Sequence, residues 1–342
     1  MMRTLIALLA AALLAGCTAA PTSSPTPSPT ATASDLPVAA PARIGLSYIP
    51  NVQFAPFYVA EADGLFDAET GTAATLRHHG AQEGLFTAIA AGQEDFVLAG
   101  GDEMLQARET GVDLVSVATY YKVYPVVVIA KEGGPIATLA DLKGKKIGVP
   151  GRYGSSWFGL LVALRTAGLT EDDVDVVEIG YTQRAALTTD QVDAVMGFVN
   201  NDLLQFGFAG IDVISLPIAD APPLVGASLV TTRGYLDANP EVVRGVAQAM
   251  VAGINALADD PTGDRALELT AEQVPGLTGQ ALEDARATLK SSFGVMTDWT
   301  WHTDGAVVAA DWQAMGEFMF DAGLLTKAPD IDAAIAPEVL AP

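Results

Sequence analysis

Residues 42–62 read ARIGLSYIPNVQFAPFYVAEA, and the pattern of apolar positions changes once within them. Ala42 to Tyr48 alternates around Ile and Leu, which predicts a β-strand. From Pro50 to Ala62 the apolar side chains fall at helical spacing until Asp63-Gly64 ends the run, which predicts a helix. A strand followed directly by a helix is the first half of an α/β unit.

The same alternation continues along the chain. Further strands are predicted at residues 74–77, 96–99, 114–119, 126–130, 146–149, 174–179, 194–199 and 227–231. Helices are predicted at residues 83–91, 102–109, 156–166, 182–188, 240–258, 279–291 and 306–322. Alternating strands and helices predict the α/β class, with mainly parallel sheets and flanking helices.

Two successive α/β runs predict two lobes. Lobe 1 is expected to contain residues 42–127 together with 226–342, because the late helices should return to cover the first sheet. Lobe 2 is expected to contain residues 128–225. A chain that crosses twice between lobes favours a hinge-bending clamp with a cleft between them.

The N-terminus predicts export and a lipid anchor. Residues 1–16 combine a basic start, a short apolar run and small residues, which is typical of a secretory signal; the run is too short to span a bilayer. Leu14-Ala15-Gly16-Cys17 resembles a bacterial lipobox, which implies acylation of Cys17. Residues 17–41 are rich in Pro, Ser and Thr and predict an extended tether. We therefore expect a lipid-anchored protein of the bacterial cell envelope, on the outer face of the cytoplasmic membrane.

Composition excludes several functions. The 342 residues include 41 acidic and 18 basic side chains, a formal charge of −23. Nucleic-acid binding needs clustered Lys and Arg, so it is not expected. One cysteine cannot form an internal disulfide, and with three histidines it cannot complete a Cys/His zinc pattern. We expect no metal, no cofactor and a monomeric chain.

Several motifs resemble the periplasmic-binding-protein-like family. Residues 48–51 (YIPN), 55–61 (APFYVAE) and 63–66 (DGLF) are similar to its opening. Residues 139–149 are similar to the start of its second lobe, and residues 191–195 resemble its usual closing strand. The family includes sulfonate and taurine binders, binders of thiamine precursors, and pyrimidine synthases. The resemblance implies the two-lobed type II fold.

Residues 82–86, 121–126 and 199–201 resemble the branch that binds flat heteroaromatic vitamins or their precursors, of the RibY and ThiY type. This implies a substrate-binding protein of an ABC importer, not an enzyme, which captures riboflavin or a thiamine-type pyrimidine and works with a permease and an ATPase. The alternatives are a sulfonate or taurine receptor, an enzyme like the pyrimidine synthases, which carry a cysteine cluster, and a structural adhesin.

A flat nitrogen heterocycle is held by stacking on aromatic rings and by a few hydrogen bonds to its edge. The carboxyl ends of parallel strands are the expected place for such groups. The candidate ligand-binding residues are Tyr48, Asn51, Phe54, Phe57, His79, Glu83, Asp102, Tyr120, Tyr121, Tyr124, Arg152, Tyr153, Ser155, Ser156, Asn200 and Asn201.

Many of these residues have a structural alternative. The alternative is helix capping for Asn51, Glu83, Asp102, Ser155 and Ser156, and core packing for Phe54 and Phe57. His78 and His79 are adjacent on a strand and point to opposite faces, so they cannot chelate a metal together. For this pair a solvated strand end is the default, with a ligand-facing His79 as the alternative. Of Asn200 and Asn201, one is expected to read the ligand edge.

Overall fold

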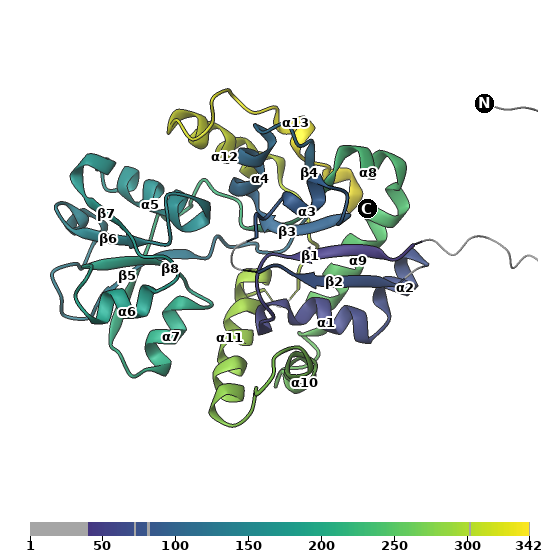
Figure 1. Ribbon diagram of the computed structural model, residues 1–342, viewed down its shortest axis with the longest axis horizontal. Helices are drawn as coiled ribbons and strands as arrows, with labels where there is room; N and C mark the ends of the chain where they lie inside the picture. Colours follow the sequence, from purple (N-terminus) through teal and green to yellow (C-terminus); the bar gives the residue numbers. More distant parts are fainter. Residues whose placement is uncertain (1–39, 72, 81–82, 301, 342) are drawn as a thin grey trace, which may run out of the picture. The chain divides into compact units, whose positions relative to one another are not determined.

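The structure, a computed structural model, describes residues 40–71, 73–80, 83–300 and 302–341 (Figure 1). The predicted signal peptide, Cys17 and nearly all of the predicted tether lie outside the described residues, as does Gln82. Every structural statement below refers to the described ranges.

The first sheet has the strand order β2-β1-β3-β10-β4. Its strands are β1 (Ala42–Leu46), β2 (Ala74–His78), β3 (Phe96–Gly100), β4 (Leu114–Thr119) and β10 (Ala227–Thr232). Strand β1 pairs in parallel with β2 and β3, whereas β10 runs antiparallel to both β3 and β4. All residues of β3 and β4 are buried, as expected for strands covered on both faces.

The second sheet has the order β7-β6-β8-β5-β9. Its strands are β5 (Val126–Lys131), β6 (Lys146–Val149), β7 (Asp175–Glu178), β8 (Ala194–Phe198) and β9 (Val213–Pro217). Strand β6 pairs in parallel with β7 and β8, whereas β5 runs antiparallel to β8 and β9.

Both sheets are therefore mixed: in each, four strands run in one direction and a single strand, β10 or β5, runs against them. The physical reason is the double crossover. Strand β5 carries the chain out of the first sheet and β10 brings it back, so these two strands start where the sheets meet. Strands β1, β3, β6 and β8, which run in the opposite direction, end there. The α/β class itself, with two sheets and flanking helices, is confirmed.

Helices cover both faces of the first sheet (Figure 1). The helices on one side are α1 (Ala55–Ala62), α2 (Leu65–Thr70), α8 (Arg233–Ala238), α9 (Pro240–Ala256), α10 (Asp264–Gln273) and α11 (Gln280–Thr297). On the other side they are α3 (Thr87–Ala90), α4 (Gly101–Arg108), α12 (Ala309–Asp321) and α13 (Ile331–Ala334). Strand β3 shows the alternation directly, because Phe96 and Leu98 pack with the first set and Val97 and Ala99 with the second.

The second sheet is sandwiched between α5 (Gly154–Thr166) on one face and α6 (Gln183–Thr188) and α7 (Asp202–Phe208) on the other. Alternate residues of β5 again divide between the two faces, with Val128 on the α5 side and Ile129 on the α6–α7 side. The apolar cluster under α5 continues into the cluster under α4 and α12. One continuous core therefore joins the two sheets.

Several predicted elements differ from the observed ones. The helix predicted at residues 83–91 is reduced to α3, because the Glu83 side chain pairs with β2 and Gly84 interrupts the run. The helix predicted from Pro50 starts as a short 3-10 turn, Val52–Phe54, before α1. Helices α2, α7, α8, α10 and α13 and strand β9 were not predicted. The division into lobes at residues 127/128 and 225/226 stays a prediction; strand β5 itself begins at Val126.

Candidate functional site

Helices α4 and α5, which belong to different sheets, begin beside each other. The Ser155 hydroxyl lies 3.3 Å from Oδ1 of Asp102. The Tyr124 hydroxyl lies 2.6 Å from Oδ2 of Asp102 and 2.8 Å from the Ser155 carbonyl oxygen. We name Asp102, Glu103, Tyr124, Gly154 and Ser155 the α4–α5 junction. The sequence predicted Asp102, Tyr124 and Ser155 as site residues, and the structure brings them together.

The junction holds two acidic groups on consecutive residues. Asp102 is fully buried; burial raises the pKa of its carboxyl to about 6, although hydrogen bonds from Tyr124, Ser155 and the Glu103 N–H oppose the rise. Burial and the neighbouring Asp102 charge raise the pKa of the Glu103 carboxyl to about 8. Sequence reasoning missed Glu103, which follows a candidate residue and was taken as part of the helix only.

Two glycines let the two helices approach this closely. A Cβ atom at Gly100 would lie 2.4 Å from Oδ1 of Asp102 and 3.0 Å from the Ser155 hydroxyl oxygen. A Cβ atom at Gly154 would lie 3.1 Å from Oε1 of Glu103, and Gly154 has a positive φ of 69° that favours glycine. The carboxyls therefore occupy space that any side chain at these positions would fill.

Tyrosine rings lie beside the carboxyls. Tyr153 and Tyr181 are 54% and 57% exposed, which is high for aromatic side chains. Partial burial, a hydrogen bond with Tyr153 and the nearby acidic groups Glu103 and Tyr48 together raise the pKa of Tyr181 to about 12. Tyr181 was missed by sequence reasoning, yet it follows strand β7 and precedes α6, so the strand-end rule applied to the other candidates would have found it.

A second group of hydrogen bonds connects the sheets near α11. The Tyr121 hydroxyl lies 3.3 Å from Oε1 of Gln53, and Nδ2 of Asn200 donates to the Tyr121 hydroxyl at 3.2 Å and to the Ser292 hydroxyl at 3.1 Å. Oδ1 of Asn200 is buried and has no partner in the described structure. The Tyr120 hydroxyl donates to the Gln53 carbonyl oxygen at 2.6 Å. Sequence reasoning missed Gln53 and Ser292, which carry no distinctive motif.

Phe54 and Phe57 lie in the core of the first sheet. Phe57 is completely buried and its ring packs 5.5 Å from that of Tyr120. Phe54 is 2% exposed and meets the His78 ring edge-on at 5.3 Å. In this arrangement the two rings pack against other side chains.

Tyr48 and Asn51 lie in the loop after β1. Nδ1 of His78 lies 2.9 Å from the Tyr48 carbonyl oxygen, and Nε2 of His78 lies 3.0 Å from the Tyr58 hydroxyl, so the imidazole ring fixes the loop. Burial lowers the pKa of His78. Oδ1 of Asn51 accepts from the N–H of Gln53, which is the capping role anticipated for it.

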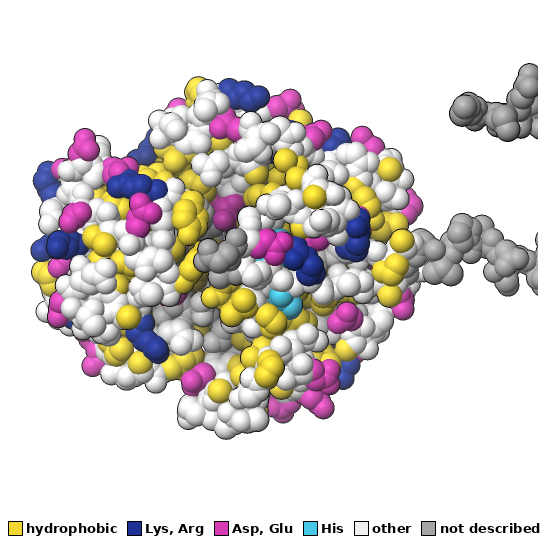
Figure 2. Space-filling model, viewed as in Figure 1, with side chains coloured by type: hydrophobic (Ala, Val, Ile, Leu, Met, Phe, Trp, Pro, Cys, Tyr) yellow, Lys and Arg dark blue, Asp and Glu magenta, His cyan; other side chains and the backbone are white. Residues whose placement is uncertain are grey.

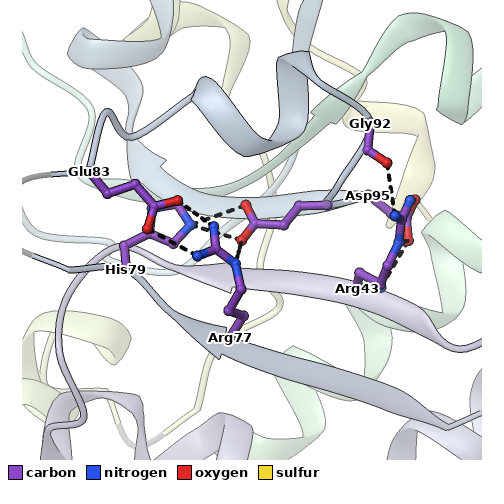
Figure 3. A network of polar contacts seen from close by, with 7 residues as sticks. Arg43, Arg77, His79, Glu83, Gly92 and Asp95 are labelled. Carbon is purple, nitrogen blue, oxygen red and sulfur yellow. Dashed lines mark hydrogen bonds and ion pairs between the residues drawn. The ribbon is translucent and has the colours of Figure 1, made fainter.

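His79 and Glu83 belong to a polar network around Arg77 (Figure 3). Nε2 of His79 lies 2.9 Å from Oε1 of the buried Glu94. Arg77 pairs with both Glu94 and Glu83, each at 2.6 Å, and holds the pKa of the Glu83 carboxyl at about 2. The default of a solvated strand end was wrong for His79, which is 2% exposed because Gly45 of β1 leaves room for the His79–Glu94 pair.

The remaining candidates lie on the second sheet, around α5 and α7. The Arg152 guanidinium stacks 4.9 Å from the centre of the Trp157 ring and pairs with Glu171. Ser156 is buried in the first turn of α5. Asn201 is half-buried at the start of α7 and makes no side-chain cap.

The charges around the junction are one-sided. Two carboxyls and the hydroxyl groups of Tyr124 and Ser155 lie there, and none of the hydrogen bonds or ion pairs found among the described residues joins a Lys or Arg to Asp102 or Glu103. On the face shown in Figure 2, acidic and basic side chains are interspersed. The junction is therefore suited to a neutral or cationic group more than to an anion.

Two cavities in the described structure lie outside the α4–α5 junction. One, of about 820 Å³, is lined by the α9–α10 loop, α10, α11 and Trp299, and the other, of about 270 Å³, lies between α12 and α13. Among the described residues, no three His, Cys, Asp or Glu side chains are grouped as a metal site. None of the described helices combines the length and apolar character that crossing a membrane requires.

The chain is similar to several known proteins. A family model described as NMT1/THI5 like matches residues 51–263. The riboflavin-binding protein RibY of Chloroflexus aurantiacus is 33% identical over 324 residues, which is 90% of this chain and 89% of that protein. A 4-amino-5-hydroxymethyl-2-methylpyrimidine phosphate synthase of Legionella pneumophila is 23% identical over 236 residues, covering 68% of this chain and 73% of that protein.

Solved structures show the same fold. The periplasmic aliphatic sulphonate binding protein SsuA of Escherichia coli superposes with a TM-score of 0.68 at 22% identity, covering 86% of this chain and 91% of that chain. The two sheets and their flanking helices therefore form a periplasmic-binding-protein fold.

Proposed function

The chain belongs to the NMT1/THI5 like family, and from this membership we propose that it is the solute-binding protein of an ABC importer and captures a flat heteroaromatic vitamin or precursor, riboflavin first. The observation that carries the proposal is the 33% identity to a riboflavin-binding protein along 90% of the chain. The ligand is held between two lobes, residues 42–127 with 226–342 and residues 128–225, and the protein does not act as an enzyme.

The α4–α5 junction supports a heteroaromatic ligand. Exposed Tyr153 and Tyr181 offer ring faces for stacking, and the carboxyls of Asp102 and Glu103 can accept from ring N–H groups or from hydroxyls. Aromatic surface with a few convergent polar groups is the usual composition of a site for a planar ligand.

The same junction argues against the sulfonate alternative. A sulfonate carries a permanent negative charge, and no described hydrogen bond or ion pair brings a Lys or Arg to Asp102 or Glu103 that could balance it. The candidate cation Arg152 is occupied by Glu171 and by the Trp157 ring. The likeness to an aliphatic sulphonate binding protein, at 22% identity, is a likeness of fold.

A ligand screen tests the proposal. We expect riboflavin to raise the melting temperature of the full chain, because a ligand that binds only the folded state stabilises it by mass action. Flavin nucleotides, thiamine, aminopyrimidines and aliphatic sulfonates form the comparison set. A shift with sulfonates alone would reject the heteroaromatic proposal.

A pair of variants assigns the response to the junction. Tyr181→Ala removes a stacking face and should weaken riboflavin binding by about tenfold or more. Phe320→Ala on α12 removes an aromatic ring that is 43% exposed and lies outside the candidate site, and it should leave the affinity unchanged. If both substitutions weaken riboflavin binding equally, the α4–α5 junction is not the ligand site.

We further propose that Cys17 is lipidated and tethers the protein to the outer face of the cytoplasmic membrane, where it meets its permease and ATPase as a monomer. Cys17→Ser should release the protein from the membrane fraction of expressing cells. Unchanged membrane association would contradict the anchor.

The second candidate function is enzymatic, and one observation favours it: a relative is named as a pyrimidine phosphate synthase. The test is incubation of the full chain with the proposed ligands under turnover conditions, followed by mass spectrometry. Recovery of riboflavin or pyrimidine unchanged would exclude chemistry on these ligands.

A further inference from the structure

The Tyr124 hydroxyl faces two oxygen atoms but carries one hydrogen. Oδ2 of Asp102 lies 2.6 Å away and the Ser155 carbonyl oxygen lies 2.8 Å away. A carbonyl oxygen can only accept, and an ionised carboxylate can only accept. If Asp102 were ionised, one of these two short contacts would have no hydrogen. If Asp102 carries a proton, it donates to Tyr124 and Tyr124 donates to Ser155, so both contacts are satisfied.

These contacts cross between the two sheets. Asp102 starts α4 on the first sheet, Ser155 starts α5 on the second, and Tyr124 lies in the connection just before β5. Opening of the lobes would separate Asp102 from Ser155 and return the carboxyl to water, where it is ionised at neutral pH.

We propose that closing the two sheets around a ligand takes up one proton on Asp102, so that ligand capture is linked to pH. The inference rests on the proposed function and names a regulation of the same site. The proton bridges Asp102 and Tyr124 in the closed arrangement and leaves when the sheets part.

The surroundings of Asp102 agree with this assignment. The acidic group that faces it on its own helix is Glu103, and Tyr124 faces it from the connecting segment. Helix α5 contributes Ser155, while α12 and the segment before β10 contribute Trp312, Met315 and Val225 around Gly101. Among the described contacts no Lys, Arg or His reaches the Asp102 carboxyl.

The direction of the pH effect follows from burial. The pKa of Asp102 in the closed arrangement is raised from 3.8 to about 6. A group with a raised pKa stabilises the closed form at low pH, and this contribution is lost as the pH rises through about 6. Riboflavin should therefore bind several-fold more tightly at pH 4.5 than at pH 7.5.

Matched variants separate this carboxyl from its neighbour. Riboflavin affinity of the full chain is measured between pH 4.5 and pH 7.5. Asp102→Asn should remove the pH dependence. Glu103→Gln, whatever its absolute affinity, should keep a pH dependence, because the contacts of Tyr124 with Asp102 and with the Ser155 carbonyl oxygen, which require the proton, remain in this variant. A flat wild-type profile, or an unchanged slope in Asp102→Asn, overturns the inference.

A ligand-free measurement keeps the inference distinct from the proposed function. The radius of gyration of the full chain, from small-angle X-ray scattering, should increase between pH 4.5 and pH 7.5 in the wild type. Asp102→Asn should show no such increase, and Tyr124→Phe should be expanded at both pH values. If riboflavin fails to bind but these changes occur, the inference stands and the assigned ligand is wrong. If riboflavin binds and the radius of gyration of the wild type is independent of pH, the inference is wrong.

Discussion

At the scale of single residues, Arg77 shows how burial decides what an ion pair contributes. Its guanidinium contacts Glu83, whose side chain is 30% exposed, and Glu94, whose side chain is 1% exposed (Figure 3). The buried carboxylate also accepts from Nε2 of His79. A buried charge that loses its partner is costly, whereas an exposed pair is screened by water.

We therefore predict different effects for the same substitution at the two positions. Glu94→Gln removes the buried carboxylate that Arg77 and His79 share, weakens both hydrogen bonds, and should lower the free energy of unfolding by about 2 kcal/mol. Glu83→Gln should leave it close to the wild-type value. Urea unfolding of the two variants at pH 7 measures both effects. Equal losses would show that exposure does not separate the two pairs.

The candidate residues that the sequence could predict share one property, which is that they follow a strand. Asp102, Ser155 and Asn200 were found in this way because the carboxyl ends of strands meet where the sheets adjoin. Glu103 and Gln53 were not found, because each lies within a helical turn. The position of Glu103 beside Gly154, and the contacts of Gln53 with Tyr120 and Tyr121, depend on how distant segments of the chain approach each other. The sequence pattern carries no information on that approach.

At the scale of elements, helix α9 packs directly on the backbone of its neighbours through glycines. A Cβ atom at Gly253 would lie 2.2 Å from the Pro56 carbonyl oxygen and 3.2 Å from Cβ of Ala60, both on α1. At Gly245 it would lie 2.7 Å from the Glu69 carbonyl oxygen on α2. Backbone atoms cannot rotate away, so any added methyl group must push the helices apart.

The prediction at this scale compares two helical glycines. Gly253→Ala should lower the free energy of unfolding by about 2 kcal/mol, because it overpacks the α1–α9 contact. Gly207→Ala on α7 meets no atom within 4 Å and should raise stability by about 0.5 to 1 kcal/mol through helix propensity. Thermal and urea unfolding report both values. If Gly253→Ala leaves the free energy of unfolding unchanged, α1 and α9 can separate without cost.

The helices and strands that the sequence predicted well are those whose pattern of apolar residues lies within the element itself. Strands β3, β4 and β5 are continuous apolar runs and were found nearly to the residue. Strand β9 is short and ends in Pro217, a residue that disfavours a strand, so it did not stand out. The antiparallel direction of β5 and β10 was missed because strand direction depends on pairing between residues about a hundred positions apart, as in the register of Ser228 with Thr119.

At the scale of the whole folded body, one apolar cluster extends through both sheets. It contains Trp157 of α5 on the second sheet and Trp312 of α12 on the first, together with Tyr124 in the connection between them. Cooperative unfolding requires shared packing, and this cluster provides it across the connection.

We predict that the two sheets unfold in a single transition. Two variants report on the two sheets separately: one keeps Trp157 as its fluorescent tryptophan, the other keeps Trp312, and the remaining tryptophans are replaced by Phe. Their fluorescence should change at the same urea concentration, after correction for the stability of each variant by circular dichroism. Two separated midpoints would show that the sheets are energetically independent.

The antiparallel pairing of β5 with β9 has a consequence for how such a protein can acquire a new preference. Val127 lies opposite Pro217, so the stretch that builds the second sheet starts and finishes at neighbouring points. The first sheet is assembled from chain on both sides of that stretch. The second sheet of a relative could therefore replace this one as a single continuous segment, whose two junctions with the rest of the chain lie side by side. One recombination event would then exchange half of the recognition surface and leave the other half unaltered.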